Sequence, residues 1–135
     1  MRRSFVISLL FLLAGTIGIG LAQEGAMLTV QQMDFCTGIQ DREPVGIDTV
    51  FSDDVGTVYC FTKIDGAADT TTISHVWYYK GEEKARVTLN IKGDSWRTWS
   101  SKTILKEWDG KWRVDVESAS GSILQSKDFV IKPTD

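Results

Sequence analysis

Hydrophobic and polar residues alternate one by one along much of this chain. The clearest case is 85–91, where four apolar side chains are interleaved with three polar ones. The segments 57–64, 73–79 and 112–117 show the same period of two. Because successive side chains of an extended strand point to opposite faces, this period predicts half-buried β-strands. A helical period is not found in the sequence after the N-terminal segment.

Turn-forming pairs separate these segments. They are Asp53-Asp54, Asp65-Gly66, Lys80-Gly81, Gly93-Asp94, Asp109-Gly110 and Ser120-Gly121. Short strands with frequent turns favour antiparallel pairing, since parallel strands need long crossover connections. The pattern over 109–131 resembles the last hairpin of immunoglobulin-like and fibronectin-like domains. We therefore predict an all-β fold, a single antiparallel β-sandwich of this type, and the pattern by itself carries no function.

The N-terminus has the features of an export signal. Arg2 and Arg3 precede an apolar run over 5–13, and the small residues of Gly20-Leu21-Ala22 suit a signal peptidase. We expect a signal peptide over 1–22, a lead-in segment over 23–34 and the β-sandwich domain over 35–135. The alternative is an uncleaved N-terminal anchor. Either way the domain is expected to be exported, to the periplasm or outside the cell.

Charge narrows the class of partner. The 113 residues after position 22 carry a net charge of −5, because two of the 15 Lys and Arg lie in the leader and all 18 Asp and Glu follow it. Nucleic acids and anionic membranes are bound mainly through lysine and arginine. We therefore expect no nucleic-acid partner and no membrane insertion beyond the leader.

Two cysteines, Cys36 and Cys60, fall in this exported domain. In an oxidising compartment we expect them to form a disulfide. Two buried free thiols are the alternative.

Tryptophan is concentrated late in the chain, with four of five between Trp96 and Trp112. On a strand over 96–103, Trp96 and Lys102 would share one face, and Arg97, Trp99 and Ser101 the other. Neither face is purely apolar, so this segment is a candidate binding strip in which rings stack and polar groups donate hydrogen bonds. The alternative is that its tryptophans fill the two halves of a small core.

A second candidate is the charged turn Asp41-Arg42-Glu43-Pro44, in which Arg42 has acids on both sides. Arg42 either forms a local ion pair or offers its planar fork of donors to an anionic ligand. The candidate binding residues are Arg42, Glu43, Trp96, Arg97, Trp99, Ser101 and Lys102.

The sequence supports a catalytic or metal site less than it supports the two candidate binding segments. The single histidine, His75, shares a strand face with Ile73 and Trp77, so we expect it to be packed and hydrogen-bonded. We expect no metal and no cofactor, and no catalytic residue is assigned. A hydrolase using Ser100 or Ser101 with Lys102 as the base remains an unfavoured alternative.

Several blocks together resemble a bacterial family, the domain of unknown function 2914. They are Asp41–Val45, Tyr59–Thr62, His75–Tyr78 and Trp96–Lys102, with Gly110-Lys111-Trp112 near the end. The likeness covers about 35–131. It implies a small domain of bacterial envelope or exported proteins and transfers no functional residue.

These observations lead to one expected function with two alternatives. We expect a non-enzymatic binding or assembly module of the bacterial envelope, which recognises a protein partner through the 41–44 turn and the 96–102 segment. The first alternative is a glycan-binding or peptidoglycan-binding module with exposed tryptophans. The second is the serine–lysine hydrolase.

Overall fold

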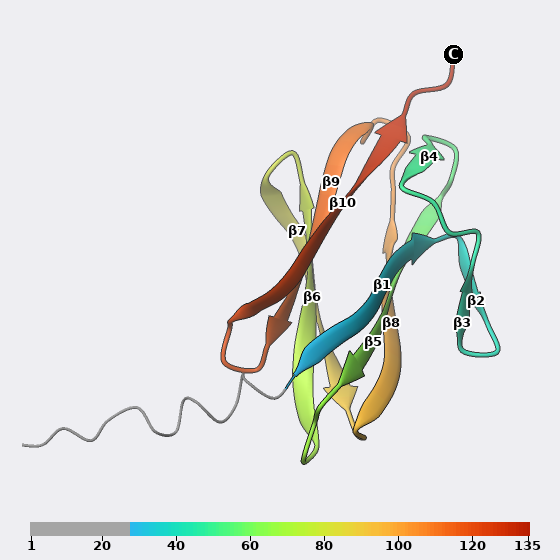
Figure 1. Cartoon of the computed structure of the whole chain (residues 1–135). Helices are drawn as coiled ribbons and strands as arrows, with labels where there is room; N and C mark the ends of the chain where they lie inside the picture. The colour runs from blue at the N-terminus through green and yellow to red at the C-terminus, as the bar shows by residue number, and fades with distance from the viewer. Residues whose placement is uncertain (1–27) are drawn as a thin grey trace, which may run out of the picture.

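The computed structural model describes residues 28–135, which form ten β-strands and no helix (Figure 1). The strands are β1 Thr29–Cys36, β2 Gly38–Gln40, β3 Glu43–Val45, β4 Val50–Ser52, β5 Thr57–Asp65, β6 Thr71–Tyr79, β7 Glu82–Ile91, β8 Ser95–Thr103, β9 Gly110–Ser118 and β10 Ile123–Lys132. The all-β prediction is confirmed. The signal peptide expected over 1–22 lies outside the described residues, among which no helix is long and apolar enough to cross a membrane.

The strands form two larger sheets and one hairpin. The three-stranded sheet has the order β1-β5-β8, the five-stranded sheet has the order β4-β10-β9-β6-β7, and β2 pairs with β3. The ladders are antiparallel with one exception, because β4 runs parallel to β10. The expectation of purely antiparallel pairing is therefore wrong at this edge. The rest of the domain forms the connection from β4 to β10, so this parallel pair needs no crossover helix.

The two larger sheets share one apolar interior. The ring of Phe35 on β1 lies 4.6 Å from that of Phe129 on β10 and 6.5 Å from that of Trp77 on β6, measured between centroids. Trp112 stacks on Phe129 at 5.8 Å with an angle of 13° between the ring planes. All four side chains are almost fully buried. Burying a side chain of this size stabilises the fold by about 1.5–3 kcal/mol, so these contacts hold the sheets together.

The predicted strands over 57–64, 73–79, 85–91 and 112–117 correspond to β5, β6, β7 and β9. Strand β1 was missed, and it begins at Thr29, inside the segment expected to be a lead-in. A shift of register between Val30 and Gln32 interrupts its pairing with β5. A β-bulge of this kind breaks the alternation of faces, which removes the pattern that would have marked the strand.

The predicted disulfide is wrong, because Cys36 and Cys60 are both free and buried. They lie on the neighbouring strands β1 and β5, where Phe35 is opposite Cys60 and Cys36 is opposite Tyr59. Residues opposite each other share a face, and successive residues do not. Cys60 therefore faces the interior and Cys36 faces the other side of the sheet, so the two side chains point apart.

Candidate functional site

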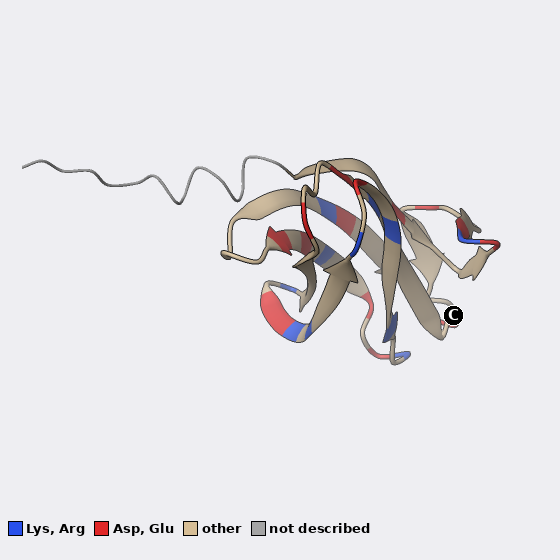
Figure 2. Cartoon of the chain, turned by 90° about the horizontal axis from the view of Figure 1, so that it is seen from below, with Lys and Arg blue, Asp and Glu red and all other residues tan. Residues whose placement is uncertain are grey.

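The β2–β3 hairpin, residues 38–45, forms an arm beside the three-stranded sheet (Figure 1). Its two turn residues, Asp41 and Arg42, both have a positive φ, 51° and 65°. This is the backbone of a tight hairpin turn that glycine or asparagine usually supplies, and a left-handed arginine costs about 1–2 kcal/mol. Figure 2 shows acidic and basic positions side by side at the tip of the arm, which projects from the rest of the molecule.

The tip of the arm contacts the start of β8. The Glu43 carboxylate lies 3.1 Å from the Arg97 guanidinium, and the Arg42 guanidinium lies over the Trp96 ring at 5.8 Å from its centroid. A local ion pair was one of the two alternatives for Arg42; Arg42 and Glu43 contact a distant strand instead. These two contacts bring together the two segments that sequence analysis had selected separately.

Trp99 and Ser101 continue the same face of β8 as Arg97. Trp99 stacks on Phe61 of β5, with centroids 6.3 Å apart and an angle of 12° between the ring planes. Phe61 faces away from the interior and is still fully buried. Ser101 is exposed. The outer face of β8 thus carries a charged residue, a half-buried ring and an exposed hydroxyl in a row.

Trp96 and Trp99 do not form a coplanar pair, because they lie on opposite faces of β8. Trp96 is opposite Ile64, whose side chain is buried in the interior, and Trp99 is opposite Phe61 on the outer face. Each is half-buried. An exposed pair of parallel indoles, the arrangement that suits sugar stacking, is therefore not built from these two residues.

Lys102 does not join this surface. Its ammonium lies over the ring of Trp108 at 5.2 Å from the centroid, and Lys84 of β7 approaches the same ring at 5.7 Å. Trp108 also packs against Tyr79 and Trp112. The candidate strip over 96–102 is thus divided, because Lys102, on the inner face of β8, lies against the partly buried Trp108 and not beside the arm.

A chain of buried polar groups crosses from one sheet to the other. The Trp77 indole N–H donates to Ser100 Oγ at 3.1 Å, and Ser100 Oγ lies 2.6 Å from His75 Nδ1. His75 Nε2 lies 3.1 Å from Thr62 Oγ1, which donates to the Thr98 carbonyl at 3.1 Å. The expectation of a packed, hydrogen-bonded His75 is confirmed.

The donor and acceptor in each of these hydrogen bonds follow from the groups at the two ends of the series. Because the Thr62 hydroxyl donates to a carbonyl, it accepts the proton of His75 Nε2. The other ring nitrogen then carries no proton, so the Ser100 hydroxyl donates to His75 Nδ1. Each group makes the hydrogen bonds that its chemistry permits only while the imidazole is neutral. Burial lowers the pKa of His75 to about 4, which keeps it neutral near pH 7.

The same geometry bears on the serine–lysine alternative. Ser100 is only 6% exposed, and its hydroxyl is used within the buried chain. Lys102 is directed toward Trp108, and Ser101 is exposed on the opposite face of the strand. A base within hydrogen-bond reach of an accessible nucleophile is the minimum for such chemistry. The serine–lysine pair of this strand does not provide that arrangement.

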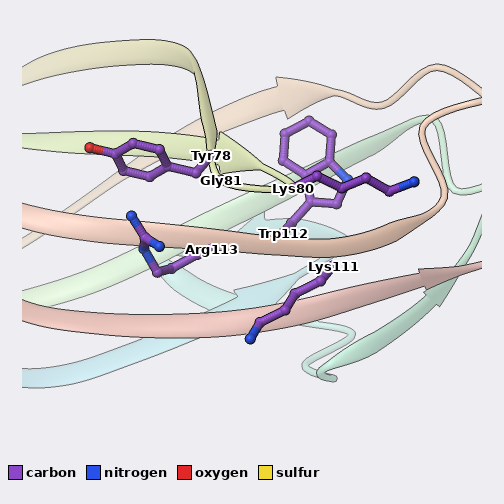
Figure 3. A pocket seen from close by; sticks show the side chains of 6 residues that line it. All are labelled: Tyr78, Lys80, Gly81, Lys111, Trp112 and Arg113. Carbon is purple, nitrogen blue, oxygen red and sulfur yellow. The ribbon is translucent and has the colours of Figure 1, made fainter.

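A separate pocket of about 230 Å³ lies at the end of β6 and the start of β9 (Figure 3). Its lining residues are Tyr78, Lys80, Gly81, Lys111, Trp112 and Arg113. Arg113 stacks on Tyr78 at 4.2 Å and is held by Asp115 at 2.9 Å, and Lys111 pairs with Asp128. The labelled cationic side chains point in different directions in Figure 3, so they do not converge on one anion.

Within 28–135, no group of His, Cys, Asp and Glu is placed to hold a metal ion.

Sequence reasoning missed the roles of Phe61 and Trp108. Alternation placed Phe61 beside Tyr59 and Lys63 on the outward face of β5, where a ring aligned with Trp99 could have been noticed. Trp108 lies in the connection between β8 and β9, outside any periodic pattern. Nothing in the sequence indicates that its ring meets Lys84 and Lys102.

These features define a small all-β domain with a mixed charged and aromatic surface on one sheet edge. Its residues 70–131 match the family described as "Protein of unknown function (DUF2914)". The match confirms the resemblance to that family for the part of the chain from β6 to β10. A comparison with curated proteins finds no match.

A comparison with solved structures finds partial matches, which include three structures of two beta-glucosidases. The enzyme from Kluyveromyces marxianus has a TM-score of 0.45 and 11% identity, and it covers 78% of this chain and 14% of its own. The enzyme from Listeria innocua in complex with glucose has a TM-score of 0.45 and 12% identity. The match covers 77% of this chain and 15% of the enzyme. A mutant of the Listeria innocua enzyme in complex with laminaribiose has a TM-score of 0.43 and 10% identity. This match covers 78% of this chain and 16% of the enzyme. This chain therefore spans only a small part of each of these proteins.

Proposed function

We propose that this chain is a non-enzymatic binding module of the bacterial envelope that recognises a protein partner. The recognition surface consists of Arg42, Glu43, Trp96, Arg97, Trp99 and Ser101, from the tip of the arm and the start and outer face of β8. The observation that carries the proposal is the double contact between Arg42–Glu43 and Trp96–Arg97, at 5.8 Å and 3.1 Å.

This contact favours a protein partner because of the residue types that it holds in place. Arginine and tryptophan are the residues most enriched among interface hot spots. The left-handed backbone at Arg42 is unfavourable, and the arginine side chain there is positioned over an aromatic ring. A residue held in a costly conformation with its side chain fixed points to a use for that side chain.

Two neighbouring residues hold the side chains of this surface in place. Phe61 on the neighbouring strand stacks on Trp99, which fixes the orientation of the Trp99 ring while Trp99 stays only half-buried. Glu43 holds Arg97, whose side chain remains 39% exposed. Because these side chains are already held in place, less conformational entropy is lost when a partner binds. Lys102, which sequence analysis grouped with these residues, is not included. Its ammonium lies over the ring of Trp108, whereas Trp96 on the same face is contacted by Arg42 of the arm.

The expected export and the finer fold type belong to the same proposal. We place a signal peptide over 1–22 and an immunoglobulin-like or fibronectin-like sandwich after it, in the periplasm or outside the cell. Mass analysis of the protein recovered from the envelope fraction tests the export. A chain beginning at Gln23 is the expected result, and a chain that keeps its leader indicates an N-terminal anchor instead.

Photo-crosslinking in the native host tests the partner. The full chain carries p-benzoylphenylalanine at Ser101 in one strain and, as a matched control, at Asn90 in another. Both positions are exposed, but Asn90 lies on the outer side of β7 in the other sheet. We expect an adduct with one other protein from position 101 and none from position 90.

The identity of the adduct is then checked with the double variant Arg97→Ala, Trp99→Ala. If this variant remains folded by circular dichroism and gives the same adduct in the same yield, the proposed surface is wrong. An adduct that is equally strong from both positions contradicts it as well.

A further inference from the structure

Strand β8 is an edge strand, and it differs from the other edges of the two larger sheets. It has β5 as its single neighbour, and all nine of its residues pair with β5 without a shift of register. The arm contacts β8 through side chains and forms no ladder with it. One row of backbone groups along β8 therefore has no strand partner in residues 28–135.

The other three edges of the two larger sheets carry features that discourage pairing with another strand. Strand β4 has only three residues, and β1 contains a bulge next to Gln32. Strand β7 begins with charged residues at 82–84, and its ladder with β6 also shifts near Trp77. Strand β8 has no such break.

The two charged residues of β8 give little protection to its edge. Arg97 is held by Glu43, and Lys102 is directed toward Trp108. The remaining residues are tryptophan, threonine and serine, and the first two favour strands. A regular strand of this composition with an unpaired edge is a template for strand addition.

We propose that a second copy of this chain pairs with β8, giving a symmetric dimer. In an antiparallel pairing centred on Trp99, the midpoint of the strand, all nine residues of one copy pair with the nine of the other. Arg97 is then opposite Ser101 of the second copy, and Trp96 is opposite its Lys102. No charged residue of β8 is opposite a like-charged residue of the other β8, and Trp99 meets Trp99 across the twofold axis, a favourable aromatic pair.

The symmetry of this pairing limits the assembly to two copies. Because β8 of each copy is used once, the contact is the same patch on both copies and stops at two. The three-stranded sheets join into one continuous sheet with both outer faces on the same side. The dimer therefore displays two copies of the surface proposed above side by side, which favours bivalent binding.

Substitutions at Ser101 test the dimer, since this residue is exposed and faces Arg97 of the second copy. Ser101→Lys places two like-charged pairs in the dimer, and Ser101→Glu places two opposite-charged pairs. Sedimentation velocity of the full chain over a concentration series measures the dimer dissociation constant. We expect Ser101→Lys to raise it about tenfold and Ser101→Glu to lower it, since each cross-strand pair counts twice.

Asn90→Lys and Asn90→Glu are the matched controls on the exposed edge strand β7. They change the net charge in the same way and are expected to leave the dissociation constant unchanged. The dimer is refuted if the chain sediments as a monomer at all concentrations, if both Ser101 variants shift the equilibrium in the same direction, or if the Asn90 variants shift it equally. Capture of a different protein from position 101 does not depend on this result, so the proposed function is tested separately.

Discussion

His75 Nδ1 of β6 lies 2.6 Å from Ser100 Oγ of β8, and this hydrogen bond joins the two sheets inside the apolar interior. It belongs to a chain that runs from the Trp77 indole through Ser100 and His75 to Thr62. A buried polar network with all its hydrogen bonds made fixes how two sheets lie on each other, because a displaced arrangement leaves its members without partners. We interpret this chain as a device that sets the alignment of the sheets.

Acid is expected to weaken the fold through His75. Burial lowers the pKa of this group from 6.5 to about 4 in the folded chain. Above pH 6.5 the imidazole is neutral in both states, and its contribution is fully present. As the pH falls from 6.5 to 4, the unfolded chain takes up a proton that the folded chain does not, and about 3 kcal/mol of stability is lost.

Urea unfolding at a series of pH values measures this loss. Because His75 is the only histidine, its ring signals in an NMR titration report its pKa without ambiguity. In the variant His75→Gln the fall in stability between pH 6.5 and 4 is expected to shrink. A ring that titrates near 6.5 in the folded protein would contradict the prediction.

Replacing Ser100 with alanine is expected to destabilise the fold by about 1–3 kcal/mol, because the Trp77 N–H and His75 Nδ1 both lose their partner in the interior. The neighbouring Ser101→Ala is the control. That residue is exposed, so its loss is expected to change the free energy of unfolding by less than about 0.5 kcal/mol. Equal effects of the two substitutions would show that the buried chain contributes nothing.

Arg42→Gly separates stability from binding. Glycine adopts the left-handed backbone of this turn freely, which favours the folded state by about 1–2 kcal/mol. The contact with Trp96 that is lost contributes about 0.5–1 kcal/mol at an exposed site. We expect the melting temperature to stay the same or rise, while the photo-crosslink from position 101 weakens. A strong fall in melting temperature would mean that Arg42 is held for stability alone.

The two thiols are expected to be free and unreactive in the native protein. Burial raises the pKa of Cys36 and of Cys60, which keeps both as thiols rather than reactive thiolates. A thiol-reactive dye should label two sites per chain after denaturation without a reductant and almost none before it. Failure to label denatured protein until a reductant is added would show that the cysteines are paired.

The sequence by itself determined the all-β class and the positions of β5, β6, β7 and β9. Their alternation is a local property, since a strand with one buried face shows it wherever its partners lie. It also identified the two segments of the candidate surface, 41–44 and 96–102, from residue types alone. The family resemblance, expected over about 35–131 and matched over 70–131, was recognisable for the same reason.

Only the tertiary structure decided which of these residues meet. The contact of Glu43 with Arg97 depends on the arm reaching β8, and the separation of Cys36 from Cys60 depends on a register offset of one residue. The placement of Lys102 against Trp108 depends on a connection with no periodic pattern. These outcomes rest on pairing between distant segments, and the composition of a segment does not specify the register in which it pairs.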